Sequence, residues 1–156
     1  MDIENILSDP INRHILRVLS QEARVSIAEL ARRTNLSAPS VSERIRRLED
    51  LGLIAGYGAQ FSPQALGYDV SVFIRIRPIA GQVGKVAKLV ADMDEIVECH
   101  RVTGEDCFIA KAYLRSVTDL EPLVDRLLPV AQTHTSIIQS TPVPPRPPAI
   151  VRGGDD

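Results

Sequence analysis

The 156-residue sequence contains no tryptophan and few aromatic side chains, which together make up 4% of it. Its two cysteines, Cys99 and Cys107, are too few for a disulfide framework or, by themselves, for a four-ligand metal site. No apolar run approaches the roughly 20 residues that a membrane-spanning helix requires. The N-terminus lacks the basic segment and apolar run of a signal peptide. We therefore expect a cytoplasmic protein with no membrane partner, no metal and no cofactor.

Lysine is absent from the first 60 residues. Residues 24–47 carry six arginines against two glutamates, a local net charge of +4 in a chain whose overall net charge is −2. The overall charge argues against a protein that coats nucleic acid indiscriminately. The local excess of arginine suits phosphate and guanine, because the guanidinium fork donates two parallel hydrogen bonds. For Arg46 taken alone, a solvated helix face is the alternative.

Residues 26–51 predict two helices joined by a tight corner. Ser26, with Glu29 three residues later, forms a capping-box pattern that predicts the start of the first helix. Asn35 is expected to end it, because Asn tolerates the left-handed backbone region. Before this helix, Arg24 lies in a loop from which it could reach a phosphate.

The second of these helices begins with Ser37 or Ser40 as its N-cap and with Pro39 in its first turn. Apolar residues at helical spacing are expected to face inward, namely Val41, Ile45 and Leu48. The opposite face carries Ser40, Glu43, Arg46, Arg47 and Asp50, with Arg44 at its border. The cap, corner, core and arginine positions together indicate a helix-turn-helix that inserts its second helix into the major groove of double-stranded DNA. The alternative is an ordinary helical hairpin.

Upstream, Asp9 and Pro10 predict the N-cap and first residue of another helix. It would complete a three-helix, winged-helix-like DNA-binding domain over residues 1–52, closed by Gly52. An extended linker is expected over residues 53–66, and a Pro-rich flexible tail over 143–156.

Residues 67–142 change from helical spacing to alternation. The expected elements are a strand over 68–77, a helix over 81–93, strands over 96–103 and 107–114, a helix opening with a Thr118–Glu121 capping box, and a strand over 133–141. This βαββαβ order predicts a ferredoxin-like domain, so that the fold class is α+β. Two helices cover only one face of such a sheet, and Phe73 on the other face favours a partner, from which we infer a homodimer.

The chain resembles the Lrp/AsnC (feast/famine) family of transcriptional regulators from about Ile11 to Thr141. The resemblance is carried by LSAPSVSERIRRLEDLGLI, by the linker that follows it, and by ECHRVTGEDCF in the βαββαβ domain. It implies a DNA-binding dimer that assembles into tetramers or octamers and responds to a small effector, commonly an amino acid, where dimers meet. It also implies that DNA is contacted by Ser37, Pro39, Ser40, Arg44 and Arg47.

By the same resemblance the effector pocket is lined by the hairpin residues Val102, Thr103, Gly104, Glu105 and Asp106. The hairpin has a rationale of its own, because Gly104 lets backbone N–H groups point at an anion while a neighbouring acid holds an ammonium. A plain tight turn explains it equally well. Thr133 and Thr135 in the last strand are weaker candidates for the same pocket.

Two further hypotheses, a metal site and an enzyme, concern the histidines and cysteines. Cys99 and His100 are adjacent in a strand, so their side chains point to opposite faces and a shared metal is disfavoured. A sirohaem-decarboxylase-like enzyme of similar arrangement would depend on His100 and His134. A second alternative is an architectural DNA-binding protein without an effector. Over both alternatives, we predict a non-enzymatic, ligand-modulated regulator of transcription whose effector acts allosterically.

Overall fold

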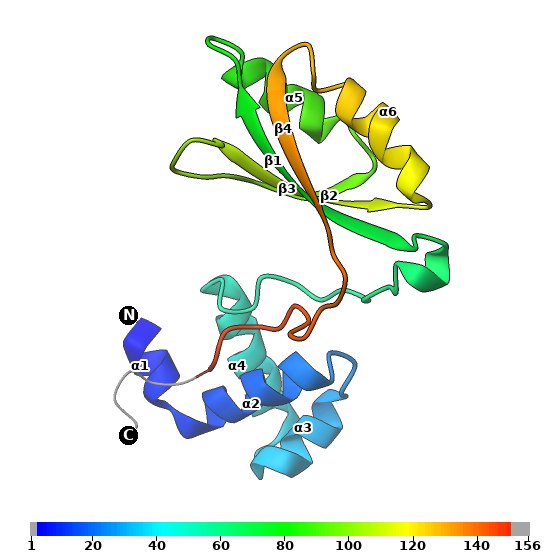
Figure 1. The fold of residues 1–156 in the computed structure, drawn as a ribbon. Helices are drawn as coiled ribbons and strands as arrows, with labels where there is room; N and C mark the ends of the chain where they lie inside the picture. The colour runs from blue at the N-terminus through cyan, green and yellow to red at the C-terminus, as the bar shows by residue number, and fades with distance from the viewer. Residues whose placement is uncertain (1–2, 151–156) are drawn as a thin grey trace. The chain divides into compact units, whose positions relative to one another are not determined.

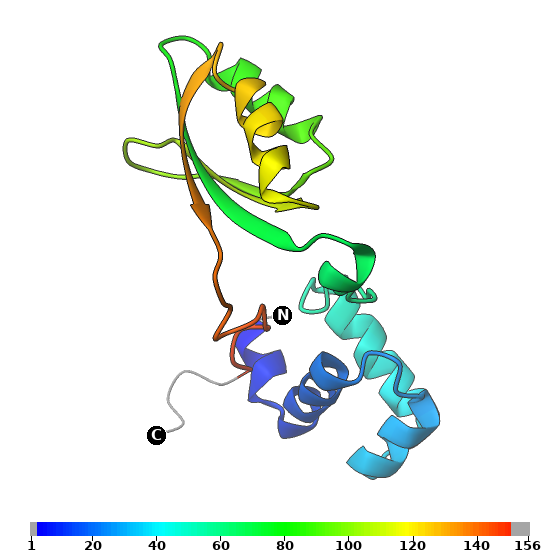
Figure 2. The same cartoon turned by 45° about the vertical axis from the view of Figure 1, so that its right-hand side comes forward.

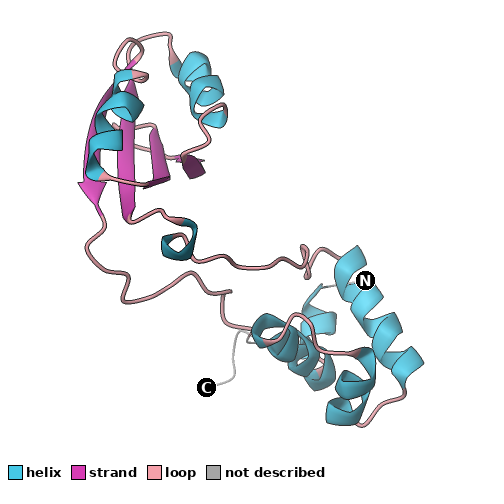
Figure 3. Ribbon diagram, turned by 90° about the vertical axis from the view of Figure 1, so that its right-hand side faces the viewer, coloured by secondary structure: helices cyan, strands magenta, loops and turns pink. Residues whose placement is uncertain are grey.

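A computed structural model describes residues 3–150 of the chain (Figure 1). The chain folds into two compact units. One contains the described residues up to Gln60 together with those from Val143 onward, and the other is Phe61–Pro142. Strands occur only in the second unit among the described residues (Figure 3), which confirms the predicted α+β class. Within residues 3–150, no helix is long and apolar enough to cross a bilayer.

The first unit is helical. Its elements are α1 (Ile3–Ser8), α2 (Pro10–Gln21), α3 (Ile27–Thr34) and α4 (Ala38–Asp50). Asp9 caps α2 as predicted, because its carboxylate accepts a hydrogen bond of 2.8 Å from the backbone of Ile11. Helix α1, which was not predicted from the sequence, is short and buries Ile6 against the rest of the unit.

The core of the first unit joins all of its helices. The side chains predicted to face inward from α4 are buried, with exposed fractions of 0%, 9% and 1% for Val41, Ile45 and Leu48. They pack with Ile15 of α2 and Leu30 of α3. At the C-terminal end of α4, Gly52 takes a φ of 70° and donates to the carbonyl of Glu49. The predicted termination of the helix at this glycine is confirmed.

The second unit has the predicted βαββαβ order. Its strands are β1 (Val70–Pro78), β2 (Ile96–Arg101), β3 (Phe108–Leu114) and β4 (Ala131–Ile137), with helices α5 (Val83–Ala91) and α6 (Leu120–Asp125). The sheet is antiparallel in the order β2-β3-β1-β4. Both helices lie against the same face of the sheet (Figure 2) and bury Ile74 and Ile76 of β1 with Val86, Leu123 and Leu127. The other face is open within one chain.

Two local expectations for the second unit were wrong. The capping box before α6 is formed by Ser116 and Asp119, not by Thr118 and Glu121, because a short 3-10 turn over Val117–Asp119 precedes the α-helix. The hairpin strands also end earlier than predicted, so that a loop spans residues 102–107 between β2 and β3. The turn is therefore longer than its Gly-Glu-Asp sequence indicated.

Candidate nucleic-acid interface and effector site

The corner between α3 and α4 has the geometry of a helix-turn-helix. Ser26 caps α3 by accepting a hydrogen bond of 3.1 Å from the backbone of Glu29. Asn35 ends α3 in the left-handed region, with φ 55° and ψ 39°. Leu36 then donates back to the carbonyl of Ala31 at 3.0 Å. The left-handed Asn35 and the hydrogen bond from Leu36 end α3 and set the direction in which α4 begins.

The first turn of α4 presents small, exposed side chains. Ser37, one of the two predicted candidates, is the N-cap, and its hydroxyl accepts from the backbone of Ser40 at 3.4 Å. The two serine hydroxyls lie 2.8 Å apart. Pro39 occupies the turn, where its missing N–H costs nothing. Unpaired backbone N–H groups at a helix start attract phosphate, and short side chains let them approach it.

Further along the same face, Arg46 is held at the surface by neighbouring carboxylates. Its guanidinium lies 2.8 Å from Glu43 and 3.5 Å from Asp50, and 65% of its side chain is exposed. The hydrogen bond from Arg46 lowers the pKa of Glu43. Exposed helix pairs of this kind contribute little to stability, because water and salt screen both charges. A phosphate can therefore replace these partners at little cost.

Arg44 is directed toward α2. Its Nη1 lies 2.5 Å from Oδ2 of Asp9 and 2.7 Å from Oδ1 of Asn12, which is buried and donates in turn to the carbonyl of Ile6. Burial alone would raise the pKa of Asp9, but the hydrogen bonds from Arg44 and from the backbone of Ile11 outweigh it and hold that pKa below its ordinary value. Arg44 thus connects α4 to the start of α2.

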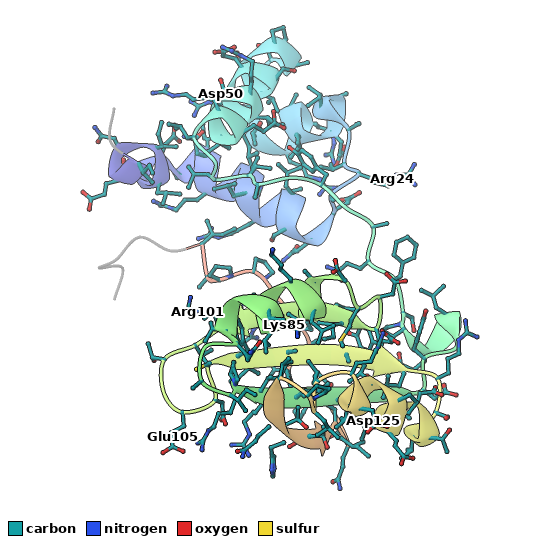
Figure 4. The ribbon with its side chains drawn as sticks, turned by 90° about the horizontal axis from the view of Figure 1, so that it is seen from above. Arg24, Asp50, Lys85, Arg101, Glu105 and Asp125 are labelled. Carbon is teal, nitrogen blue, oxygen red and sulfur yellow. The ribbon has the colours of Figure 1, made fainter. Side chains whose placement is uncertain are left out.

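The two remaining arginines of the predicted interface differ in their surroundings. Arg47 is half-buried and, with Ser40 and Glu43, lines a cavity of about 530 Å³ bounded by α1, α2 and α4. Arg24 is exposed in the loop before α3 and points away from the helices (Figure 4).

The predicted effector hairpin connects β2 and β3. The backbone of Val102 donates to the carbonyl of Cys107 at 2.8 Å, which closes the loop. Gly104 has a φ of 106°, a conformation that side chains rarely adopt, and Cys107 is also left-handed, with a φ of 61°. Glu105 lies at the tip of the hairpin (Figure 4), and Thr103 is exposed beside the glycine.

Two arginines of β1 contact the acids of this hairpin. The guanidinium of Arg77 bonds the carboxylate of Glu105 and donates to its carbonyl at 3.2 Å. Arg75 lies 3.7 Å from the carboxylate of Asp106. Arg75 and Arg77 were not among the predicted site residues, although the alternation along β1 placed both on the open face of the sheet. Together with the hairpin they form a cluster of opposite charges that is open to solvent.

The remaining candidates lie elsewhere in the same chain. Thr133 and Thr135 pair across the sheet with Ile76 and Ile74, so their side chains share the face that the helices cover. They are therefore not beside the hairpin cluster. His100 lies on β2 and His134 on β4, the two opposite edges of the sheet. Within the described part of the chain, no group of three or more His, Cys, Asp or Glu side chains could hold a metal ion.

Comparison with known proteins agrees with this geometry in both units. Residues 8–55 match the model of a winged helix-turn-helix DNA-binding domain, and residues 71–148 match that of the Lrp/AsnC ligand binding domain. The HTH-type transcriptional regulator LrpA of Mycobacterium tuberculosis is 33% identical over 136 residues, which cover 85% of this chain and 91% of the relative. Regulatory protein AsnC of Escherichia coli is 31% identical over 147 residues, covering 90% and 96%.

Solved structures give the same result. The structure of Bacillus subtilis LrpC superposes with a TM-score of 0.80 at 31% identity and covers 85% of this chain and 95% of its own. A feast or famine regulatory protein of Mycobacterium tuberculosis complexed with L-methionine has a TM-score of 0.77 at 30% identity, covering 89% and 97%. With matching models in both units and relatives above 30% identity along most of its length, this chain belongs to the Lrp/AsnC family of transcriptional regulators.

Proposed function

We propose that the protein is a sequence-specific DNA-binding regulator of transcription whose DNA binding is modulated by a small effector, an amino acid. The observation that carries the proposal is the outward face of α4. It begins with an N-cap serine and short side chains, and it continues with arginines whose surface ion pairs are weak. The proposal is supported by relatives that are named HTH-type transcriptional regulators, such as LrpA and LrpC.

In this proposal the first turn of α4 enters the major groove. Ser37, Pro39 and Ser40 approach the backbone and base edges, because they lie at the exposed start of the helix. Arg46 and Arg47 reach guanine or phosphate oxygens farther along the helix. Glu43 holds Arg46 before DNA arrives, and Arg24 makes a phosphate contact from its loop. Arg44 contributes by setting the position of α4 through Asp9 and Asn12.

The effector is proposed to bind at the β2–β3 hairpin. An amino acid offers a carboxylate and an ammonium, and the hairpin cluster offers guanidinium groups from Arg75 and Arg77 beside carboxylates of Glu105 and Asp106. Gly104 allows the backbone to approach the ligand closely. Two family members with similar folds are described as complexes with L-methionine, which supports an amino acid as the ligand class.

Assembly is proposed to proceed through the open face of the sheet. Phe73 at its centre is 44% exposed in a single chain, and Ile109 and Tyr113 of β3 are half-buried on the same face. A second copy would cover these apolar side chains and give a homodimer, from which tetramers or octamers are built. The effector then acts by changing the relative stability of assembly states, and so the spacing of the α4 helices on DNA.

The DNA-binding proposal is tested with a duplex selected by the protein from a random library. In fluorescence anisotropy titrations at fixed salt, Arg47→Ala should weaken binding by about tenfold, since one base or phosphate contact is worth about 1–3 kcal/mol. Lys85→Ala, an exposed change on α5 of the other unit, is the control and should bind as wild type does. Equal affinities for all three proteins would contradict the proposal.

The effector proposal needs a separate measurement. Thermal unfolding of the wild type is recorded with each of the twenty amino acids, and a hit is repeated with Arg77→Met. We expect stabilisation by at least one amino acid, and its loss in the variant, because the guanidinium beside Glu105 is gone. A ligand that stabilises Arg77→Met as much as wild type would show that the hairpin cluster is not the site.

A further inference from the structure

The end of the described chain returns to the DNA-binding unit. Residues from Val143 onward belong to the first unit, although they follow directly on the second, which ends at Pro142. Ile150 packs against the core of the first unit. The guanidinium of Arg17 on α2 donates to the carbonyl of Ile150 at 3.4 Å. Ile150 is therefore held to the first unit both by its side chain and by its backbone carbonyl.

The segment forms one wall of an apolar groove of about 570 Å³ on the first unit. It is lined by leucines of α1 and α2 (Leu7, Leu16 and Leu19), by residues 53–58 after α4, and on one side by Pro147–Ile150. Leu53 and Ile54 are half-buried there and pack against the same core as Ile150. The red segment in Figure 1 can be followed to this side of the first unit.

The sequence of the segment suits such a groove. Residues 141–150 read TPVPPRPPAI, so five prolines precede the apolar anchor. Proline fixes φ and favours the extended polyproline conformation, which lowers the entropy lost when the segment is ordered. Proline also has no N–H that would need a partner at an apolar surface. The carbonyls of the segment remain available as acceptors, and Arg17 donates to that of Ile150.

We propose that the surface of α1 and α2 beside this groove is a docking site for the chain's own residues 147–150, with Ile150 as the anchor. Docking makes a second connection between the effector-binding unit and the DNA-binding unit, in addition to the linker after α4. Residues 53–58 of that linker line the same groove, so the docked segment and the linker restrain each other. The docked segment, which follows β4 in the chain, thereby restrains the linker and α2. None of its residues belongs to the proposed DNA-binding or effector-binding site.

Hydrogen exchange of the full-length protein, read by mass spectrometry, tests the docking. In Ile150→Asp, the amides of Leu53 and Ile54, which donate to the carbonyl of Leu48, and those of the C-terminal half of α2 should exchange on the order of tenfold faster, as expected when a partly buried isoleucine is withdrawn. Ile150→Ala should give a smaller increase. Val143→Asp is the matched control, because Val143 lies in the same segment but is 61% exposed. It should exchange like the wild type.

Two outcomes would overturn the proposal. The first is an unchanged exchange pattern in Ile150→Asp, with the sheet of the second unit serving as the internal reference. The second is that the docked segment comes from another copy of the chain. Isotope-labelled wild type is mixed with an excess of unlabelled Ile150→Asp and left to exchange subunits. If the labelled chains keep their slow exchange, the segment docks within its own chain; if they lose it, the second copy is the donor and the proposal is wrong.

Discussion

Arg44→Ala should destabilise the helical unit by about 2 kcal/mol, because it removes two hydrogen bonds that join α4 to α2. Arg44 bonds Asp9 and Asn12, and the side chains of the ion pair are 31% and 30% exposed. A hydrogen bond to a charged group contributes about 1.5–3 kcal/mol when buried, and partial solvent screening reduces this. Asn12, which is 6% exposed, would also lose the partner of its carbonyl oxygen.

The assay is thermal unfolding followed by calorimetry and by circular dichroism at the helical band. For a small domain, about 2 kcal/mol corresponds to a fall in Tm of roughly 10 °C. Arg46→Ala is the matched control on the same helix, since its two partners are surface carboxylates, and it should lose much less stability than Arg44→Ala does. A double-mutant cycle of Asp9→Ala with Arg44→Ala should show coupling. If Arg44→Ala and Arg46→Ala unfold at the same temperature, the assignment of Arg44 as a structural connection is refuted.

Three further predictions concern other parts of the structure. Ile45→Ala should cost about 2–4 kcal/mol of folding free energy, measured by urea unfolding, because it empties a buried site in the core of the first unit. Glu29→Gln should be less stable than wild type at neutral pH, but the difference should vanish as the pH falls from 4.5 toward 2. The hydrogen bonds from Arg32 and Arg33 lower the pKa of Glu29 from 4.5 to about 2, so their stabilisation is complete above pH 4.5 and is lost progressively as the pH falls toward 2; a difference that persists at the acid end would contradict this. Gly104→Val should abolish the effector's thermal shift and leave DNA affinity intact, because valine is strained at a φ of 106°; normal ligand uptake in calorimetry would refute it.

The helix-turn-helix could be predicted from sequence because its determinants are local. The N-cap serines, the left-handed Asn35 and the apolar residues at helical spacing each act within a few residues of the chain. The order of strands and helices in the second unit followed from the change of period at Val70. In both cases the structure reproduces the pattern because burial of one face decides the conformation.

Contacts between distant residues could not be predicted in this way. Arg44 and Asp9 are 35 residues apart, and their ion pair depends on how α4 crosses α2. Arg77 and Glu105 come together only because β1 and β3 are neighbours in the sheet. The short helix α1 carries one buried side chain, Ile6, which is too little for a periodic signal. The faces occupied by Thr133 and Thr135 were fixed by the register of β4 against β1.

The account depends most on the outward face of α4 reading the major groove. The most direct measurement replaces each guanine of the selected duplex with 7-deazaguanine, which removes the N7 acceptor of the major groove, and determines the affinity by anisotropy. We expect at least one replacement to weaken binding about tenfold, and inosine replacements, which remove only the minor-groove amino group, to leave the affinity unchanged. Binding that is sensitive to inosine and indifferent to 7-deazaguanine would contradict the account.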